Sequence, residues 1–312
     1  MKKTKSLFHT SVAALAVLHC INKLIDSSFI SNTNKKSNGN YYHWKHGDIY
    51  YTVSKSQEES KKPLLLIHDL TVFSSSFEWN QVIHQLSENY TVYAVDLIGC
   101  GKSDKPEITY TNYFYVQMIT DFIKEVIGTP TKVIVSGLSA SFVLMANSVN
   151  NDLFTDITLI NPKTISSLKK APNDRSKILM KLFQLPIIGK TAYYIAVNKQ
   201  NTEYNLTEKY FYNPFHLKPS ISKAYYDAAH ASNGRGKSLL ASLEGYYVNI
   251  DITGALKNAE NNINVILGSH NENVNEIQNS YTRINPNVTV RIISDAKNLP
   301  QLETPEELLK LL

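Results

Sequence analysis

The chain has 312 residues, enough for one large α/β domain with an insertion or for two small domains. Its 32 basic and 27 acidic residues are interspersed and leave a net charge of +5 without a basic stripe, so nucleic-acid binding is not expected. Its two cysteines, Cys20 and Cys100, lie in very different contexts and no metal-ligand spacing occurs. We therefore expect no structural disulfide, no metal and no cofactor.

The first 26 residues form an apolar segment with a basic start. Lys2, Lys3 and Lys5 precede an apolar run over residues 7–25, which Asn22 and other polar residues interrupt. Three interpretations remain open: an uncleaved signal anchor, an interfacial amphipathic helix, and a cleaved signal or disordered tail. We expect this segment to lie outside the globular domain and to associate the protein with a membrane. The alternative to membrane association is a cytoplasmic or exported protein. Residues 27–43, which begin with a stretch rich in serine, asparagine and lysine, are predicted to be a linker.

The rest of the chain alternates between strand and helix patterns. An edge strand is expected over residues 48–53, and further strands over residues 63–67, 91–95, 132–135, 157–160, 263–267 and 288–293. Helical periodicity lies between them, over residues 77–86, 112–127, 141–149, 274–283 and 305–312. This alternation is typical of a mostly parallel, doubly wound sheet, which we assign to residues 44–162 and 257–312.

One connection is much longer than the others. Residues 163–256 contain no convincing buried strand and show helical periodicity rich in lysine and tyrosine. In a parallel sheet the ligand crevice lies at the carboxyl ends of the strands. Because this segment leaves the end of a central strand, we predict a helical cap over that crevice.

A serine stands where a strand is expected to turn into a helix. Gly137-Leu138-Ser139-Ala140-Ser141 follows the third of the predicted buried strands, and such a turn can raise a serine into the crevice, where the amides at the helix N-terminus point at a ligand. The same five residues could also be a plain turn followed by a helix cap. Their position after a central strand favours a nucleophile, although a serine hydroxyl without a base stays protonated at pH 7.

Four motifs in this order resemble the α/β-hydrolase superfamily, in its capped branch of esterases and epoxide hydrolases. They are His68-Asp69 after the first buried strand, the loop over residues 96–106, the serine turn, and the C-terminal residues 299–306. The resemblance implies the α/β-hydrolase fold, with Asp69 where the family usually has glycine. It also implies an oxyanion hole formed by the backbone N–H groups of Leu70 and Ala140.

The resemblance places the acid and the histidine of a catalytic triad at positions where this chain has asparagine. Gly268-Ser269-His270-Asn271 puts Asn271 at the acid position, and Asn298 stands at the histidine position. An amide holds no titratable proton near neutral pH and cannot act as a general base. His270, beside the acid position, is the first candidate for a substitute base. His68 is expected to be buried and to hold loops together by hydrogen bonds.

Two hypotheses for the function follow. The first is an esterase-like serine hydrolase acting on a small apolar substrate, with Ser139 as nucleophile and with weak or altered activity. The second is a catalytically inactive pseudoenzyme that binds a small ligand or a protein partner in the capped crevice.

Overall fold

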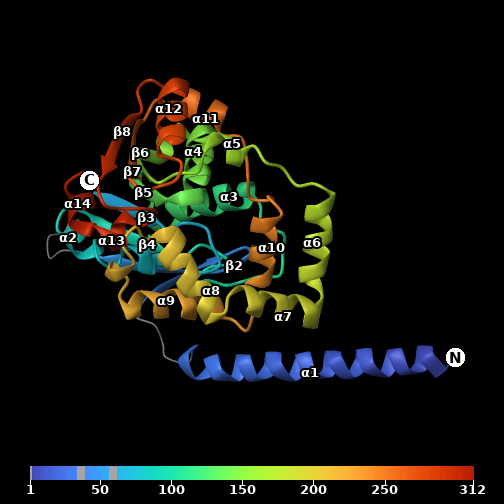
Figure 1. Cartoon of the computed structure of the whole chain (residues 1–312). Helices are drawn as coiled ribbons and strands as arrows, with labels where there is room; N and C mark the ends of the chain where they lie inside the picture. Colours follow the sequence, from blue (N-terminus) through green and yellow to red (C-terminus); the bar gives the residue numbers. More distant parts are fainter. Residues whose placement is uncertain (1, 34–38, 56–61) are drawn as a thin grey trace.

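The computed structural model describes residues 2–33, 39–55 and 62–312, and its centre is an eight-stranded sheet (Figure 1). The strand order is β1-β2-β4-β3-β5-β6-β7-β8. β1 and β2 pair antiparallel, as do β2 and β4, and all other neighbours pair in parallel. The bounds are β1 (Asn40–Trp44), β2 (Gly47–Ser54), β3 (Pro63–Ile67), β4 (Thr91–Val95), β5 (Thr131–Ser136), β6 (Phe154–Ile160), β7 (Asn262–Gly268) and β8 (Thr289–Ile293). The predicted mostly parallel sheet is confirmed.

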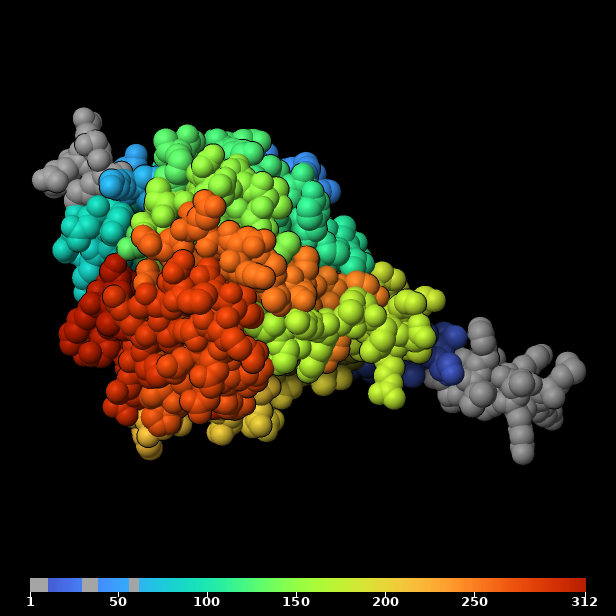
Figure 2. Space-filling model, turned by 90° about the horizontal axis from the view of Figure 1, so that it is seen from above, coloured from blue at the N-terminus to red at the C-terminus, as the bar shows by residue number. Residues whose placement is uncertain are grey.

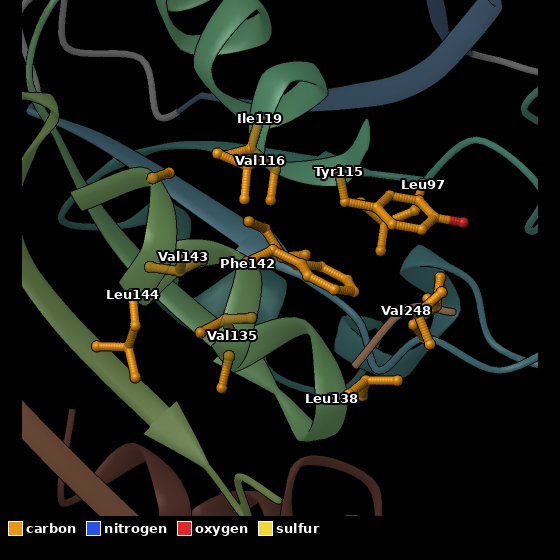
Figure 3. Packing of buried hydrophobic residues seen from close by; sticks show 14 of the residues in the cluster. Leu97, Tyr115, Val116, Ile119, Val135, Leu138, Phe142, Val143, Leu144 and Val248 are labelled. Carbon is orange, nitrogen blue, oxygen red and sulfur yellow. The ribbon is translucent and has the colours of Figure 1, made fainter. Parts of the chain in front are cut away.

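Helices cover both faces of the sheet, because the central strands are apolar on both sides. In β3, Leu65 and Ile67 belong to one apolar cluster, whereas Leu64 and Leu66 belong to another. The first cluster includes side chains of α3 (Asn112–Phe122), α4 (Ala140–Val149), α11 (Thr253–Lys257) and α12 (Val274–Ile284). Figure 3 shows part of it, where α3 and α4 pack against β5. The second cluster includes α2 (Ile83–Ser87) and α14 (Pro305–Leu309). The doubly wound architecture is therefore confirmed.

The long connection between β6 and β7 is helical, and its described residues contain no strand. Its helices are α5 (Ile165–Leu168), α6 (Asp174–Gln184), α7 (Pro186–Ala196), α8 (Lys199–Tyr204), α9 (Pro219–His230), α10 (Lys237–Glu244) and then α11. A separate apolar cluster joins this helical insertion to the short α13 (Pro300–Glu303) through Leu206, Phe211, Tyr225 and Leu302. That the insertion works as a cap stays a prediction.

The predicted linker over residues 27–43 differs from the structure. The first helix, α1 (Lys2–Thr33), continues into this stretch, and β1 begins at Asn40. β1 forms a hairpin with β2, in which Asn40 lies opposite Tyr51 and Trp44 opposite Gly47. The aromatic residues Tyr41, Tyr42 and Trp44 explain the difference, because they favour a half-buried strand over a linker. Residues 34–38 of the expected linker lie outside the described residues.

The second half of α1 packs on the helical insertion, which corrects the expectation that the whole segment lies outside the domain. The Asn22 side chain is buried and donates to the carbonyl of Ile187 at 3.2 Å and to Thr191 Oγ1 at 3.0 Å. The Asp26 carboxylate pairs with Lys190 at 2.6 Å. Figure 1 shows α1 running beneath α9 and α7 and then projecting beyond the body. Asn22, which interrupts the apolar run, and Asp26, which follows it, thus bind the helix to the domain.

Candidate functional site

A cavity of about 500 Å³ lies at the carboxyl ends of the parallel strands. Each of four neighbouring strands contributes lining residues just beyond its end: Asp69 after β3, Gly137 after β5, Asn161 after β6 and Asn271 after β7. Asn298, from the loop after β8, completes this end of the cavity. Ligands of parallel sheets bind at this edge, so the cavity is the candidate functional site.

The two asparagines at the expected acid and histidine positions meet in the cavity. Asn271 Nδ2 donates to Asn298 Oδ1 at 2.7 Å, and Asn298 Nδ2 donates to the carbonyl of Lys209 at 2.7 Å. The loops after β7 and β8 therefore converge as the resemblance implied. The amides satisfy one another, however, and offer no group that takes up a proton near neutral pH.

Asn161 is a third amide of this network and was not predicted from the sequence. Its Oδ1 accepts from the Gly268 N–H at 3.0 Å and from Asn271 Nδ2 at 3.3 Å, while its Nδ2 donates to the carbonyl of Lys297 at 2.9 Å. Its φ is +43°, a conformation that asparagine tolerates better than most residues. An asparagine directly after a buried strand and before a proline was the signal that could have identified it.

Ser139 faces away from the cavity, which corrects its expected position in the crevice. The side chain is fully buried, and Oγ donates to the carbonyl of His68 at 2.7 Å. Its backbone is ordinary right-handed helix, with φ −62° and ψ −20°. The positive φ of the turn, +60°, belongs instead to Gly137, which lines the cavity. Because a nucleophile elbow carries its serine on the strained residue of the turn, the exposed position here is a glycine.

The carboxylate of Asp69 occupies the space beside Gly137. A Cβ atom added to Gly137 would lie 2.1 Å from Asp69 Oδ1, so the carboxylate fills the volume that a side chain at 137 would need. The same Oδ1 accepts from the backbone N–H of Leu138 at 2.7 Å. In an elbow centred on residue 137, this amide would belong to the oxyanion hole. The Asp69 carboxylate therefore occupies the place where the oxyanion of a substrate would bind.

The expected oxyanion donors are placed differently from the prediction. The N–H of Ala140 is used within the turn, where it bonds the carbonyls of Gly137 and Leu138. Leu70 is buried in the apolar core. Neither residue lines the cavity, because the turn projects Gly137 toward the cavity and holds Ser139 and Ala140 at the start of α4.

Neither candidate histidine can serve as a base for Ser139 in this arrangement. His68 is fully buried, and burial lowers the pKa of its imidazole below the ordinary value. The Leu97 N–H donates to His68 Nε2 at 3.0 Å, so the proton is on Nδ1, which donates to the carbonyl of Asp69 at 2.6 Å. His270 is exposed, stacks on Tyr212 with ring centroids 3.4 Å apart, and does not line the cavity. A substitute base at His270 is therefore not supported.

Glu78 lies directly behind Asp69 and was missed by the sequence analysis. It is fully buried, and its Oε2 accepts from the Asp69 N–H at 3.2 Å and from Gln301 Nε2 at 3.2 Å. Burial, together with repulsion from the Asp69 charge, raises the pKa of Glu78 to about 8. The side chain thus holds a proton at pH 7. Only its position beside the buried Trp79 could have suggested that it is internal.

Comparison with known proteins agrees with this architecture. The chain is 39% identical over 64 residues to the 2-hydroxy-6-oxo-6-(2'-aminophenyl)hexa-2,4-dienoic acid hydrolase of Metapseudomonas resinovorans. This match covers 20% of the chain and 22% of that protein, about a fifth of each. The chain is also 38% identical over 60 residues to an uncharacterized protein of Mycobacterium bovis. This second match covers 19% of the chain and 17% of that protein.

Solved structures match over most of the chain. A serine hydrolase involved in carbazole degradation superposes with a TM-score of 0.71 at 16% identity, covering 88% of this chain and 96% of that one. A protein described as a membrane phospholipase A gives a TM-score of 0.67 at 18% identity and covers 100% of this chain and 96% of that one. At these identities the likeness shows the fold alone. A family model described as the alpha/beta hydrolase family matches residues 64–311, and the chain therefore belongs to that family.

Proposed function

We propose that the protein binds a small polar ligand in the cavity and does not hydrolyse esters through a serine, histidine and acid triad. The observation that carries the proposal is the turn after β5. Gly137 occupies its cavity-facing position, and Ser139 is turned toward the His68 carbonyl. The base position holds Asn298, which cannot accept a proton from a hydroxyl at neutral pH. The positions expected for the triad nucleophile and base are thus filled by a glycine and an amide.

The lining of the cavity supports a polar ligand rather than the small apolar one expected from the sequence. The amides described above share it with the Asp69 carboxylate, and Lys163, Lys170 and Glu276 line it farther out. Such a surface offers donors, acceptors and both signs of charge. Amino acids, dicarboxylates and small sugars carry groups that pair with these side chains, whereas an apolar ester would leave them without partners.

Two measurements on the full-length protein test this proposal. A fluorophosphonate probe, which labels activated serines, should leave the protein unlabelled. Calorimetric titration with a panel of amino acids, dicarboxylates and monosaccharides should yield a binder whose affinity falls in Asp69→Asn and is unchanged in Ser139→Ala. Rapid labelling that is lost in Ser139→Ala would overturn the proposal.

Hydrolysis of a small ester is the second candidate, and the contact between Asn271 and Asn298 favours it. This contact supports the assignment of the two loops to the acid and histidine positions that the resemblance implies. Activity would require Ser139 to leave its bond with the His68 carbonyl and enter the cavity. Turnover of p-nitrophenyl esters above about 1 per second, lost in Ser139→Ala, would establish this candidate.

We also propose that α1 associates the protein with a membrane. Its stretch Ser11–Phe29 is long and apolar enough to cross a bilayer, with a mean hydropathy of 1.3, although signal sequences share these properties. The structural relative described as a membrane phospholipase A matches the chain over its whole length, α1 included. Flotation of the full chain with lipid vesicles, and loss of flotation when residues 1–33 are removed, tests this part.

A further inference from the structure

The two halves of α1 have different surroundings. The first half projects from the domain before Asn22, and we call it the free half; the second half is bound to the domain. Every residue from Ser11 to Val17 is exposed, and Val12 and Val17 have exposed fractions of 50% and 58%. From Asn22 to Phe29 the helix contacts α7 and α9, and Phe29 stacks on His230 with ring centroids 4.4 Å apart. Residues 12–18 of the free half are continuously apolar (VAALAVL), so this part of the helix is suited to immersion in lipid.

The bound half cannot enter lipid without a large loss. It includes Asn22, Lys23 and Asp26, and a charged residue at the centre of a membrane helix strongly disfavours insertion. Entry would also separate Asp26 from Lys190 and from the hydroxyl of Tyr194. Only the part before Asn22 is therefore available to a bilayer.

The free half is shorter than a bilayer is thick. Residues 7–21 form about 22 Å of helix at 1.5 Å per residue, compared with about 30 Å of hydrocarbon. To immerse this half, the membrane surface must lie close to the point where α1 leaves the body. That point is beside the start of α7, because Asn22 bonds the carbonyl of Ile187.

An apolar corner of the insertion lies at this point. Leu182 at the end of α6, Leu185 between the two helices, and Ile188 in the first turn of α7 have exposed fractions of 41%, 44% and 40%. Lys181 on α6 is exposed next to them. We call these four residues the α6–α7 corner. Figure 2 shows the blue residues of α1 emerging beside the yellow-green residues of this region, at one end of the molecule.

We propose that the α6–α7 corner docks on the headgroup region of an anionic bilayer while the free half of α1 is immersed in the same membrane. The inference rests on the proposed membrane association of α1 and adds a second contact to it. The three apolar side chains of the corner would enter the interface, and Lys181 would face anionic headgroups. The ion pair of Asp26 with Lys190 fixes the helix to α7 beside the corner.

Fluorescence from two positions on one helix tests the proposal. In the full chain with Cys20→Ser, an environment-sensitive dye is attached to Leu185→Cys at the corner or to Ile195→Cys near the other end of α7. Both positions are exposed, by 44% and 63%, and Cys100 is buried. On vesicles of phosphatidylcholine and phosphatidylglycerol, the dye at 185 should shift to the blue and be quenched by brominated lipids. The dye at 195 should do neither.

The other outcomes separate the membrane association of α1 from the docking of the α6–α7 corner. Protein that does not float with vesicles contradicts the membrane association itself. Protein that floats without a shift at 185 keeps that association and overturns the docking of the corner, as does an equal shift at 195. A blue shift that grows with protein concentration in the absence of vesicles would assign the corner to a second copy of the chain. Lys181→Glu should reduce the shift at 185 on anionic vesicles and leave the spectrum at 195 unchanged.

Discussion

The asparagine loops and the β5 turn differ from the expected serine hydrolase site in two ways. The loops that carry Asn271 and Asn298 are in contact, but the contact joins two amides and contains no titratable group. The turn keeps its serine, yet Ser139 points at the His68 carbonyl and Gly137 faces the cavity. The loops contact each other through amides, and the turn has its positive φ and cavity-facing position at a glycine, with the serine two residues later. A backbone arrangement can therefore be present without the side chains that the chemistry needs.

The largest expected effect comes from repairing both regions together. Asn271→Asp with Asn298→His restores only the loops, so ester turnover should stay at background. Adding Gly137→Ser and Asp69→Gly places a hydroxyl on the turn and clears the space that the carboxylate fills. Turnover of p-nitrophenyl acetate should then rise on the order of 10^3-fold or more, since loss of a triad histidine alone removes a factor of about 10^6 in a serine protease.

The matched control for this repair carries Gly137→Ala in place of Gly137→Ser, with the other three changes kept. It should fold like the repaired protein and stay at background. If the Asn271→Asp and Asn298→His variant is itself active and loses that activity in Ser139→Ala, then Ser139 can reach the cavity and the comparison between the two regions fails.

A second change measures how closely Asp69 packs against Gly137 in the turn. Gly137→Ala combines a positive φ with a Cβ that would lie 2.1 Å from Asp69 Oδ1, so the free energy of unfolding should fall by about 2–4 kcal/mol. Gly128→Ala is the matched control, because Gly128 has φ +77° and nothing within 4 Å of an added Cβ. It should lose only about 1 kcal/mol. Equal losses in urea unfolding would show that Asp69 does not fill that space.

The pH dependence of stability should distinguish the two regions. The amide loops hold no titratable triad group, whereas Glu78 behind the turn has a pKa raised from 4.5 to about 8. Between these values the folded protein holds a proton that the unfolded chain has released, so stability should fall as pH rises through this window. Glu78→Gln should flatten that part of the curve and be the more stable protein at pH 9. Parallel curves for both proteins would contradict this assignment.

The smallest effect is expected from Ser139→Ala. The change removes one buried hydrogen bond to the His68 carbonyl and should reduce the free energy of unfolding by about 1 kcal/mol. Any residual ester turnover should be unchanged. Ser141→Ala is a useful reference, because Ser141 Oγ donates to the Leu138 carbonyl in the same helix start. A fall in turnover seen only in Ser139→Ala would show that this serine takes part in chemistry.

The sheet and the convergence of the loops could be predicted from the sequence because both depend on local patterns. A run such as Leu64-Leu65-Leu66-Ile67 is apolar on both faces wherever it occurs, and the carboxyl ends of parallel strands meet at one edge. Asn271 and Asn298 each follow a strand by a few residues, so topology alone brings them together.

The orientation of the turn could not be predicted, because it depends on which of its residues carries the positive φ. That residue is Gly137 rather than Ser139, and the choice reflects contacts with Asp69, which lies 69 residues from Leu138 in the chain. The docking of α1 was missed for a similar reason. Asn22 was interpreted as an interruption of an apolar run, whereas its partner Thr191 is 169 residues away.

The distance along the chain between α1 and its partners also determines when their contacts can form during synthesis. Asn22 leaves the ribosome long before Ile187, 165 residues later. At roughly 5–20 residues per second, the apolar helix is without its docking surface for about 10–30 s. During that interval all sides of the helix are accessible. The contacts of Asn22 and Asp26 with α7 can form only afterwards, so they do not cover the helix while the rest of the chain is being synthesised.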